Sequence, residues 1–376
     1  MRILVVFGTR PEAIKLAPVV LALAERPREF SVSVCVTAQH REMLDQVLEL
    51  YAIRPDHDLD IMRPDQTLPD LTATALVALG RVLATERPDL VMVQGDTTTT
   101  MVAALAAFYA KVPVAHVEAG LRTRSKHAPF PEEVNRRVTS VIADLHFAPT
   151  DGAKRNLLAE GISAASVHVT GNTVVDALIL ARRKLAGHGP AAPELQRLDA
   201  RRTVVLVTAH RRESFGAGLE SICGAIRDLV ERNPDIAVVF PVHLNPSVRT
   251  QVRRVLAGQA AAEGRLLLTD PLSYTDLVWM LDRCRLVLTD SGGIQEEAPS
   301  FQKPVLVMRD VTERPEGVAA GVARLVGTDL IRIREETERL LRDEDAYATM
   351  TGAGNPYGDG RAAERVVDVL RQRGTQ

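Results

Sequence analysis

The segment Asp290-Ser291-Gly292-Gly293-Ile294-Gln295-Glu296-Glu297 has the composition of an anion-binding turn. It follows the apolar run 286–289, which predicts a buried strand, and its continuation favours a helix. Gly292 and Gly293 permit a sharp turn and a close approach of a ligand to the backbone. The N–H groups and the positive dipole end of the helix then suit a phosphate. An ordinary tight turn uses the same glycines, so both interpretations stay open for this segment alone.

A similar turn opens the chain, at Gly8-Thr9-Arg10-Pro11-Glu12-Ala13-Ile14-Lys15. It follows the apolar run 3–7, and Arg10 and Lys15 add positive charge to a predicted helix start. Neither the G-x-G-x-x-G pattern nor a P-loop is present, so a dinucleotide or ATP site is not supported. The alternative is a solvated Arg and Lys on the first helical turn.

Three carboxylates follow predicted strands or begin a helix: Asp96 in 95–97, Glu118 in 116–120 and Glu132 in 131–133. If the strand ends converge, the three meet beside the basic residues of 122–126. Glu118 is the strongest candidate, because a carboxylate that ends an apolar strand is costly to bury without a partner or a task. Asp96 could instead cap a helix, and Glu132 could complement a helix dipole.

Polar residues also end strands in the second half. His210 ends the run from residue 204, and His243 follows the next strand. A lone histidine is more often structural, but two at successive strand ends, beside two arginines, indicate a ligand rim. Arg314 follows a later strand, and Glu297 is placed to accept ribose hydroxyls.

These positions require parallel sheets whose carboxyl ends carry the loops. Short apolar runs alternate with helical stretches throughout, which predicts an α/β fold. We expect two doubly wound, Rossmann-like domains that face a cleft. Residues 1–170 with the final helix (361–376) form the first domain and 171–360 the second, with a hinge near Gly171-Asn172.

Composition limits the possible functions. The 376 residues are 46% hydrophobic and 25% charged with net charge −2, which fits a two-domain globular protein and gives no nucleic-acid footprint. Cys35, Cys223 and Cys284 form no C-x-x-C pair, so no metal site is indicated and a reducing compartment is expected. No apolar run approaches the ~20 residues of a membrane span, so we expect a cytoplasmic protein without membrane partners.

Nine ordered segments carry a resemblance to a known family: GTRPEAIK, GDT, HVEAGLRT, PFPEE-x-NR, AHRRES, PVHLNP, DSGGIQEE, TERPEG and NPYGDGR. Together they resemble the non-hydrolysing UDP-N-acetylglucosamine 2-epimerases, from residue 3 to about 370. The resemblance implies a glycosyltransferase-B-like fold whose last helix returns to the first domain. It also implies cofactor-free, reversible C2 epimerisation of a UDP-sugar by elimination and re-addition of UDP, a homodimer, and a role in bacterial cell-surface polysaccharide synthesis.

By motif position, the resemblance also assigns residues. Its acid–base carboxylates are Asp96, Glu118 and Glu132, and its functional histidine is His210. Its UDP contacts are Arg10, Lys15, Ser291, Gly292, Gly293 and Glu297, to which we add Arg314. Gln39 and His243 match an activating second UDP-N-acetylglucosamine site of some relatives, whereas Glu42, Asp65 and the loop 124–127 depart from the family pattern. A hydrolysing relative, a glycosyltransferase and a non-catalytic UDP-sugar sensor are the alternatives.

Overall fold

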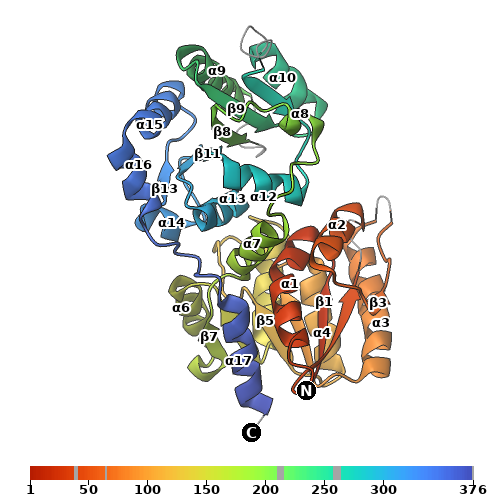
Figure 1. Cartoon of the computed structure of the whole chain (residues 1–376). Helices are drawn as coiled ribbons and strands as arrows, with labels where there is room; N and C mark the ends of the chain where they lie inside the picture. The colour runs from red at the N-terminus through yellow and green to blue at the C-terminus, as the bar shows by residue number, and fades with distance from the viewer. Residues whose placement is uncertain (38–40, 64–65, 210–215, 257–263, 375–376) are drawn as a thin grey trace. The chain divides into compact units, whose positions relative to one another are not determined.

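The computed structural model describes the chain except residues 38–40, 64–65, 210–215, 257–263 and 375–376 (Figure 1). The contacts within the chain divide it into two compact units. The first is Met1–Leu180 with Tyr357–Gln376, and the second is Ala181–Pro356. Each unit contains one parallel sheet with helices packed on it, so the predicted α/β fold with two doubly wound units is confirmed.

The first unit contains a seven-stranded sheet in the order β3-β2-β1-β4-β5-β6-β7. The order reverses between β1 and β4, which makes this pair the topological switch point where ligands of such sheets bind. The strands are β1 (Arg2–Phe7), β2 (Ser31–Val36), β3 (His57–Asp58), β4 (Leu90–Gln94), β5 (Val114–Val117), β6 (Leu145–Ala148) and β7 (Val167–Val169).

The helices of the first unit pack on both faces of this sheet. α1 packs against α2 and α17, while α3, α4 and α5 pack side by side in a second row. The central strands are apolar on both faces because helices cover both. The helices are α1 (Arg10–Ala24), α2 (Arg41–Tyr51), α3 (Leu68–Glu86), α4 (Thr98–Tyr109), α5 (Glu132–Ile142), α6 (Asp151–Ala159), α7 (Thr173–Lys184) and α17 (Ala362–Gly374), with a 3-10 turn η1 (Ala164–Ser166).

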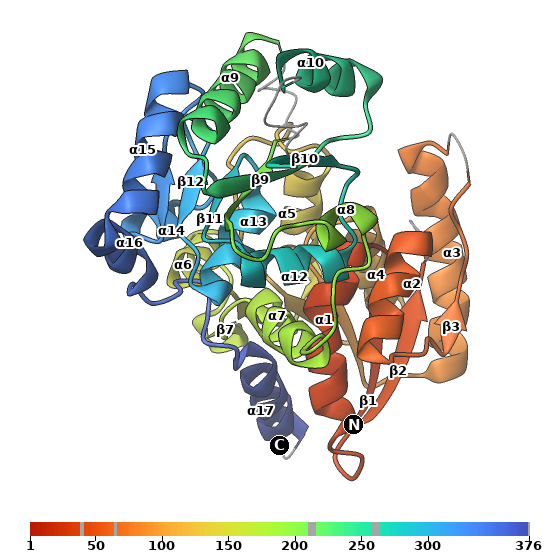
Figure 2. The ribbon, with the colours of Figure 1, turned by 45° about the horizontal axis from the view of Figure 1, so that its top comes forward.

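The second unit repeats this plan with six strands in the order β10-β9-β8-β11-β12-β13. Its switch point lies between β8 and β11, and α9 packs against both α10 and α15 (Figure 2). The strands are β8 (Thr203–Thr208), β9 (Ile236–Pro241), β10 (Leu266–Thr269), β11 (Leu286–Thr289), β12 (Val305–Val307) and β13 (Ala323–Leu325). The helices are α8 (Pro193–Gln196), α9 (Ala217–Arg232), α10 (Pro246–Leu256), α12 (Tyr274–Arg283), α13 (Gly292–Glu297), η3 (Ala298–Phe301), α14 (Pro315–Ala319), α15 (Leu330–Arg342) and α16 (Glu344–Thr351).

The chain passes between the units at other positions than the sequence suggested. The expected boundaries were 170 and 361, whereas the units divide after Leu180 and before Tyr357. The difference has a physical cause: the Tyr51 hydroxyl donates to the Ala177 carbonyl at 2.9 Å, and the Asn172 N–H donates to the Tyr357 carbonyl at 2.7 Å. These bonds tie most of α7 and the return segment to the first unit.

One expectation about membranes needs correction. Among the described residues, α3 is long and apolar enough to cross a membrane, judged by length and composition alone. A helix from the core of a globular protein passes the same test. In this structure Leu71, Ala75 and Leu79 of α3 are buried in the apolar core that includes β1 and β4.

The final helix docks on the first unit through a buried carboxylate. Asp176 of α7 accepts the N–H groups of Ala362 and Ala363 at 3.2 and 2.9 Å, so it caps the start of α17. Burial raises the pKa of Asp176, and the two N–H donors only partly oppose that rise. The expected return of the last helix to the first unit is therefore observed (Figure 1).

The capping role of Asp176 can be measured. Asp176→Ala orphans two N–H groups, so we expect the free energy of unfolding to fall by about 1–3 kcal/mol. Asp329→Ala is the control, since Asp329 caps α15 through one exposed bond of 2.8 Å to Arg332 N–H, and about 0.5–1 kcal/mol is expected there. Urea titration provides both values, and an equal loss in the two variants would contradict the role.

The raised pKa of Asp176 determines how its contribution to the free energy of unfolding changes with pH. A carboxyl whose pKa is higher in the folded chain contributes most below its ordinary value of 3.8 and loses that contribution as pH rises through the folded pKa. The cost of Asp176→Ala should therefore be smaller at pH 7 than at pH 3.5.

Candidate functional site

A buried carboxylate joins the two loops at the switch point of the first sheet. Glu12 of α1 is 1% exposed and accepts the N–H groups of Gly8 and Thr9 at 3.1 and 2.8 Å. It also accepts the hydroxyls of Thr97 and Thr100, at the start of α4, at 2.6 and 3.0 Å. Burial raises the pKa of Glu12 although four donors oppose it. The loop after β1 and the loop after β4 are thus fixed to each other.

Glu118, the residue after β5, is held by donors from three elements. Its Oε1 lies 2.5 Å from Lys15 Nζ and 3.1 Å from Asn172 Nδ2, and its Oε2 lies 2.5 Å from Gln94 Nε2. Its φ of +63° is in the left-handed region, which is strained for a residue other than glycine and clusters at functional sites. Such a set of N–H donors complements a carboxylate anion. Lys15 is therefore not the solvated lysine of the alternative interpretation.

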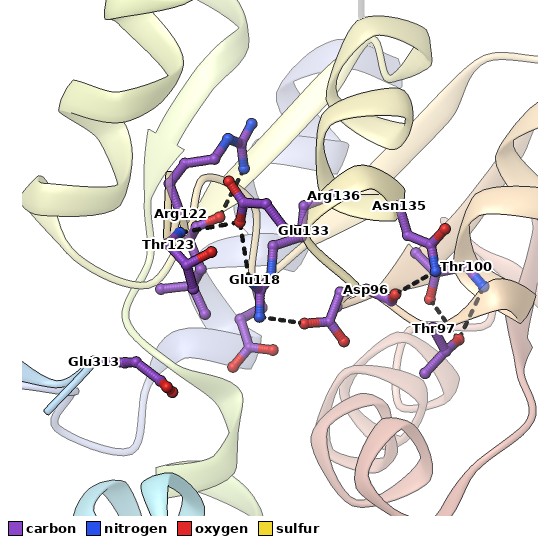
Figure 3. A network of polar contacts seen from close by, with 12 residues as sticks. Asp96, Thr97, Thr100, Glu118, Arg122, Thr123, Glu133, Asn135, Arg136 and Glu313 are labelled. Carbon is purple, nitrogen blue, oxygen red and sulfur yellow. Dashed lines mark hydrogen bonds and ion pairs between the residues drawn. The ribbon is translucent and has the colours of Figure 1, made fainter. Parts of the chain in front are cut away.

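Asp96 lies beside Glu118 because β4 and β5 are neighbouring strands. A Cβ on Gly95 would be 3.6 Å from Glu118 Oε2, which places that carboxylate against the turn that carries Asp96. Arg136 of α5 pairs with the Asp96 carboxylate at 2.6 Å (Figure 3). The cap of α4 is Thr97, so Asp96 is not the helix cap of the alternative interpretation.

Glu132 begins α5, the helix that supports Asp96. Asn135 donates to the Asp96 carbonyl at 2.9 Å, and Arg136 binds the carboxylate. Residues three and four apart share a helix face, so Glu132 lies on the face of α5 that is turned toward Asp96. The Glu132 Oε2 is buried and accepts no hydrogen bond from the described part of the chain. The first unit thus brings all three predicted carboxylates to one region.

The loop after Glu118 is ordered by side chains that sequence reasoning had grouped with the site. The Arg122 side chain is 2% exposed and forms a bidentate pair with Glu160 at 2.8 Å. Glu133 accepts the N–H groups of Thr123 and Arg124 at 3.0 and 3.2 Å (Figure 3). Burial works against ionisation of Glu133, but these bonds and Arg136 hold its pKa below the usual range. Arg122 and Glu133 therefore support the loop.

His116 has a similar supporting role. Its Nε2 lies 2.8 Å from the Gly95 carbonyl, and burial lowers the pKa of His116 to about 4. The ring is therefore neutral near pH 7 and donates to the turn that carries Asp96.

In the second unit, the predicted phosphate turn follows β11. Gly292 and Gly293 form the first turn of α13, and neither has a left-handed φ, so their backbone conformation does not itself require glycine. Among the described residues, a Cβ on Gly293 would meet Glu297 Oε1 and Ser291 Oγ, both at 3.8 Å. The packing of the unit thus leaves room for a side chain at Gly293. It also places Glu297 beside the N–H groups of the turn.

Gln295 and Arg314 connect this turn to the loop after β12. The buried Gln295 donates to the Ser291 carbonyl at 3.2 Å and accepts the Thr312 hydroxyl at 2.6 Å. Arg314 forms an ion pair with Glu296, so its guanidinium is already engaged within the unit. Sequence reasoning missed Gln295, because an amide within a helix carries no recognisable signal.

Of the remaining predicted site residues, the structure describes Arg10 and His243. Arg10 begins α1 and is partly exposed. His243 is exposed, and its Nδ1 accepts the Asn245 N–H at 3.1 Å. His210 and Gln39 lie outside the described residues. Within the described ranges, no group of three His, Cys, Asp or Glu residues could hold a metal ion.

Comparisons with known proteins identify the family. A family model described as UDP-N-acetylglucosamine 2-epimerase matches residues 22–371. The UDP-N-acetylglucosamine 2-epimerase of Escherichia coli strain K12 is 52% identical over 375 residues, which are 99% of this chain and 98% of that protein.

Solved structures agree. The UDP-GlcNAc 2-epimerase from Neisseria meningitidis bound to UDP-GlcNAc has a TM-score of 0.88 and 46% identity, with 99% of this chain and 100% of that one covered. The Methanocaldococcus jannaschii enzyme in complex with UDP-GlcNAc and UDP has a TM-score of 0.79 and 32% identity over the same shares. This likeness confirms the glycosyltransferase-B-like fold. The chain belongs to the UDP-N-acetylglucosamine 2-epimerase family.

Proposed function

We propose that this protein reversibly epimerises UDP-N-acetylglucosamine at C2 to UDP-N-acetylmannosamine. Family membership supports the substrate. The observation that carries the chemistry is the pair of carboxylates, Asp96 and Glu118, on adjoining strand ends, with Glu118 held by Lys15 and two amides.

The reaction begins with an elimination. No carbonyl acidifies the C2 proton, so its removal is coupled to cleavage of the C1–O bond. The proton passes to a carboxylate, the C2–H electron pair forms the C1=C2 bond, and UDP departs with the C1–O pair. Glu118 is the preferred base because its N–H donors favour an anion.

Re-addition reverses these bonds on the other face of C2. A proton is delivered to C2, and UDP oxygen attacks C1. This second step requires a carboxyl group on the opposite face, for which Asp96 and Glu132 are the candidates. The buried Glu132 Oε2 accepts no hydrogen bond from the described residues, so this oxygen is not engaged by a donor of the described chain.

We assign UDP to the turn after β11. The N–H groups of Ser291, Gly292 and Gly293 would bind phosphate oxygens, and Glu297 would accept the ribose hydroxyls. Arg10, Lys15 and Arg314 are the other predicted UDP contacts, and His210 is the predicted functional histidine. Gln39 and His243 remain candidates for an effector site.

A hydrolysing relative that releases N-acetylmannosamine and UDP is the second candidate. A UDP-sugar sensor would not need three carboxylates at one sheet edge. The cellular role proposed here is supply of a precursor for bacterial cell-surface polysaccharide in the cytoplasm. The three free cysteines fit a reducing compartment, since each is buried and burial raises its thiol pKa to about 12.

We also infer a homodimer. Large apolar side chains are exposed on α3, α4 and α5, which pack side by side: Val77 is 56%, Phe108 61%, Tyr109 66% and Val141 81% exposed. Exposed apolar groups gathered on adjacent helices mark an interaction surface, and a second copy of the chain is the proposed occupant.

Reaction in heavy water tests the activity. UDP-N-acetylglucosamine incubated with the protein in D₂O should settle as a mixture of both UDP-sugars with deuterium at C2, followed by NMR. Complete conversion to free sugar and UDP would instead show the hydrolase. Glu118→Gln and Asp96→Asn should each lower turnover at least ~10²-fold with little change in UDP affinity. Glu86→Gln is the control, since this carboxylate binds Ser33 of β2 and His57 of the edge strand β3, which β1 and β4 separate from β5.

Gly293→Ala tests the UDP assignment separately from folding. The new methyl group meets no described atom closer than 3.8 Å, so the free energy of unfolding should change by less than about 1 kcal/mol. UDP affinity, measured by calorimetry, should fall at least ~10-fold if phosphate approaches this backbone. Gly354→Ala, where a Cβ would have no atom of the described segments within 4 Å, should change neither quantity. Full UDP affinity in Gly293→Ala would place the phosphates elsewhere.

Light scattering tests the dimer. The native protein should have twice the 41.0 kDa of one chain, and Val141→Glu should shift the mass toward that of one chain because a charge is costly in an apolar interface. Ile331→Glu, at an apolar residue 54% exposed on α15, should leave the mass unchanged. A monomeric native protein would refute the assignment of this face.

A further inference from the structure

We propose that Asn172 is a positioning residue, which fixes the orientation of the Glu118 carboxylate for proton transfer; this inference rests on the proposed function. Asn172 precedes α7 and is 2% exposed. Its Nδ2 donates to Glu118 Oε1 at 3.1 Å, from an element far from β5 in the sequence.

The amide can present only its donor to Glu118. The Asn172 Oδ1 accepts the Val174 N–H at 3.1 Å, so Nδ2 must face the carboxylate. A flipped amide would set its oxygen against the Glu118 anion and its NH₂ against the Val174 N–H. Both contacts would be repulsive, so the rotamer is determined by its neighbours.

The backbone of Asn172 is fixed as well. Its N–H donates to the Tyr357 carbonyl at 2.7 Å, and its carbonyl accepts the Val175 N–H at 3.1 Å. The preceding residue, Gly171, has φ +91°, a left-handed conformation that favours glycine. A side chain anchored at both ends suits the task of orienting another group.

Asn172 and Lys15 both donate to Glu118 Oε1, but their side chains differ in length and charge. Lys15 has a long stem and a charge that a phosphate also attracts. Asn172 is short, neutral and buried, so it can keep Glu118 Oε1 in place while the lysine moves. Gln94 does the same for Glu118 Oε2 from the end of β4.

Several other charged or titratable groups face Glu118 within the described part of the chain. Lys15 comes from α1, and Asp96 follows β4 with its partner Arg136 from α5. His116 is on β5, the strand that Glu118 follows, and is neutral near pH 7. A new carboxylate at position 172 would add a negative charge in direct contact with Glu118.

Asn172→Asp and a matched control test the proposal. Asn233 in the second unit donates through Nδ2 to Glu338 Oε1, also at 3.1 Å, so Asn233→Asp makes the same change beside another buried glutamate. We expect Asn172→Asp to lower kcat ~10–10²-fold, with KM changed less than ~2-fold, and to move the acid limb of the pH–rate profile up by about one unit. Asn233→Asp should keep both kcat and the profile. A profile of Asn172→Asp that coincides with that of the native protein would overturn the proposal.

A second variant, Asn172→Ser, tests the proposal if Asn172→Asp does not fold. Asn172→Ser keeps an oxygen for the Val174 N–H, since serine is a good helix cap, but cannot reach Glu118. It should fold and show the kcat loss without the shift of the acid limb. A fully active Asn172→Ser would also overturn the proposal.

An NMR measurement separates this proposal from the proposed function. In protein with ¹³C-labelled glutamate carboxyls, the Glu118 signal is assigned by its absence in Glu118→Gln. Its titration should move to higher pH in Asn172→Asp and stay in place in Asn233→Asp. This titration does not depend on turnover. An inactive native protein would therefore refute the epimerase activity, while the titration would still test the contact between Asn172 and Glu118.

Discussion

The buried carboxylate of Glu12 is the contact on which the candidate site of the first unit depends. Placing a charge away from water is costly, and four donors, two from the loop after β1 and two from the start of α4, offset part of that cost. Because the donors come from both loops, neither loop can shift without leaving the carboxylate or a donor unsatisfied. The place of Asp96 relative to Lys15, and through Lys15 to Glu118, follows from this one residue.

Close packing beneath the same loops adds to the constraint. A Cβ on Gly8 would lie 2.0 Å from Thr37 Oγ1 and 2.6 Å from Thr99 Oγ1, and these two hydroxyls bind each other at 2.9 Å. Gly8 is therefore required by contact with the hydroxyl pair. In the second unit the opposite holds at Gly293, where the neighbouring atoms leave room. Two glycine turns that look alike in sequence thus meet different physical requirements.

Much of the architecture could be predicted because long apolar strands and capped helices carry local signals. The short strands β3 and β13 could not, since His57–Asp58 and Ala323–Leu325 have no apolar run and are strands only by pairing at a sheet edge. The candidate carboxylates were found by their place after strands. Two of their supports, Gln94 and Asn172, act across distant parts of the chain, so no spacing reveals them. The third, Glu12, has the Thr9-x-x-Glu12 spacing of a helix capping box, but that spacing does not reveal its contacts with Thr97 and Thr100. Adjacent Glu132 and Glu133 look equivalent in sequence, and only tertiary contacts assign Glu133 to the loop amides.

The discontinuous first unit has a consequence for the order of biosynthesis. The second unit, Ala181–Pro356, is one continuous stretch, whereas the first requires Tyr357 and α17 to be complete. During vectorial synthesis the later-encoded unit therefore has all its residues before the earlier one does. Until the last turns of α17 leave the ribosome, the apolar face of α1 that α17 covers is open to solvent, and Asp176 has no helix to cap. The first unit is thus the part of this chain whose apolar surface stays incompletely covered longest during synthesis.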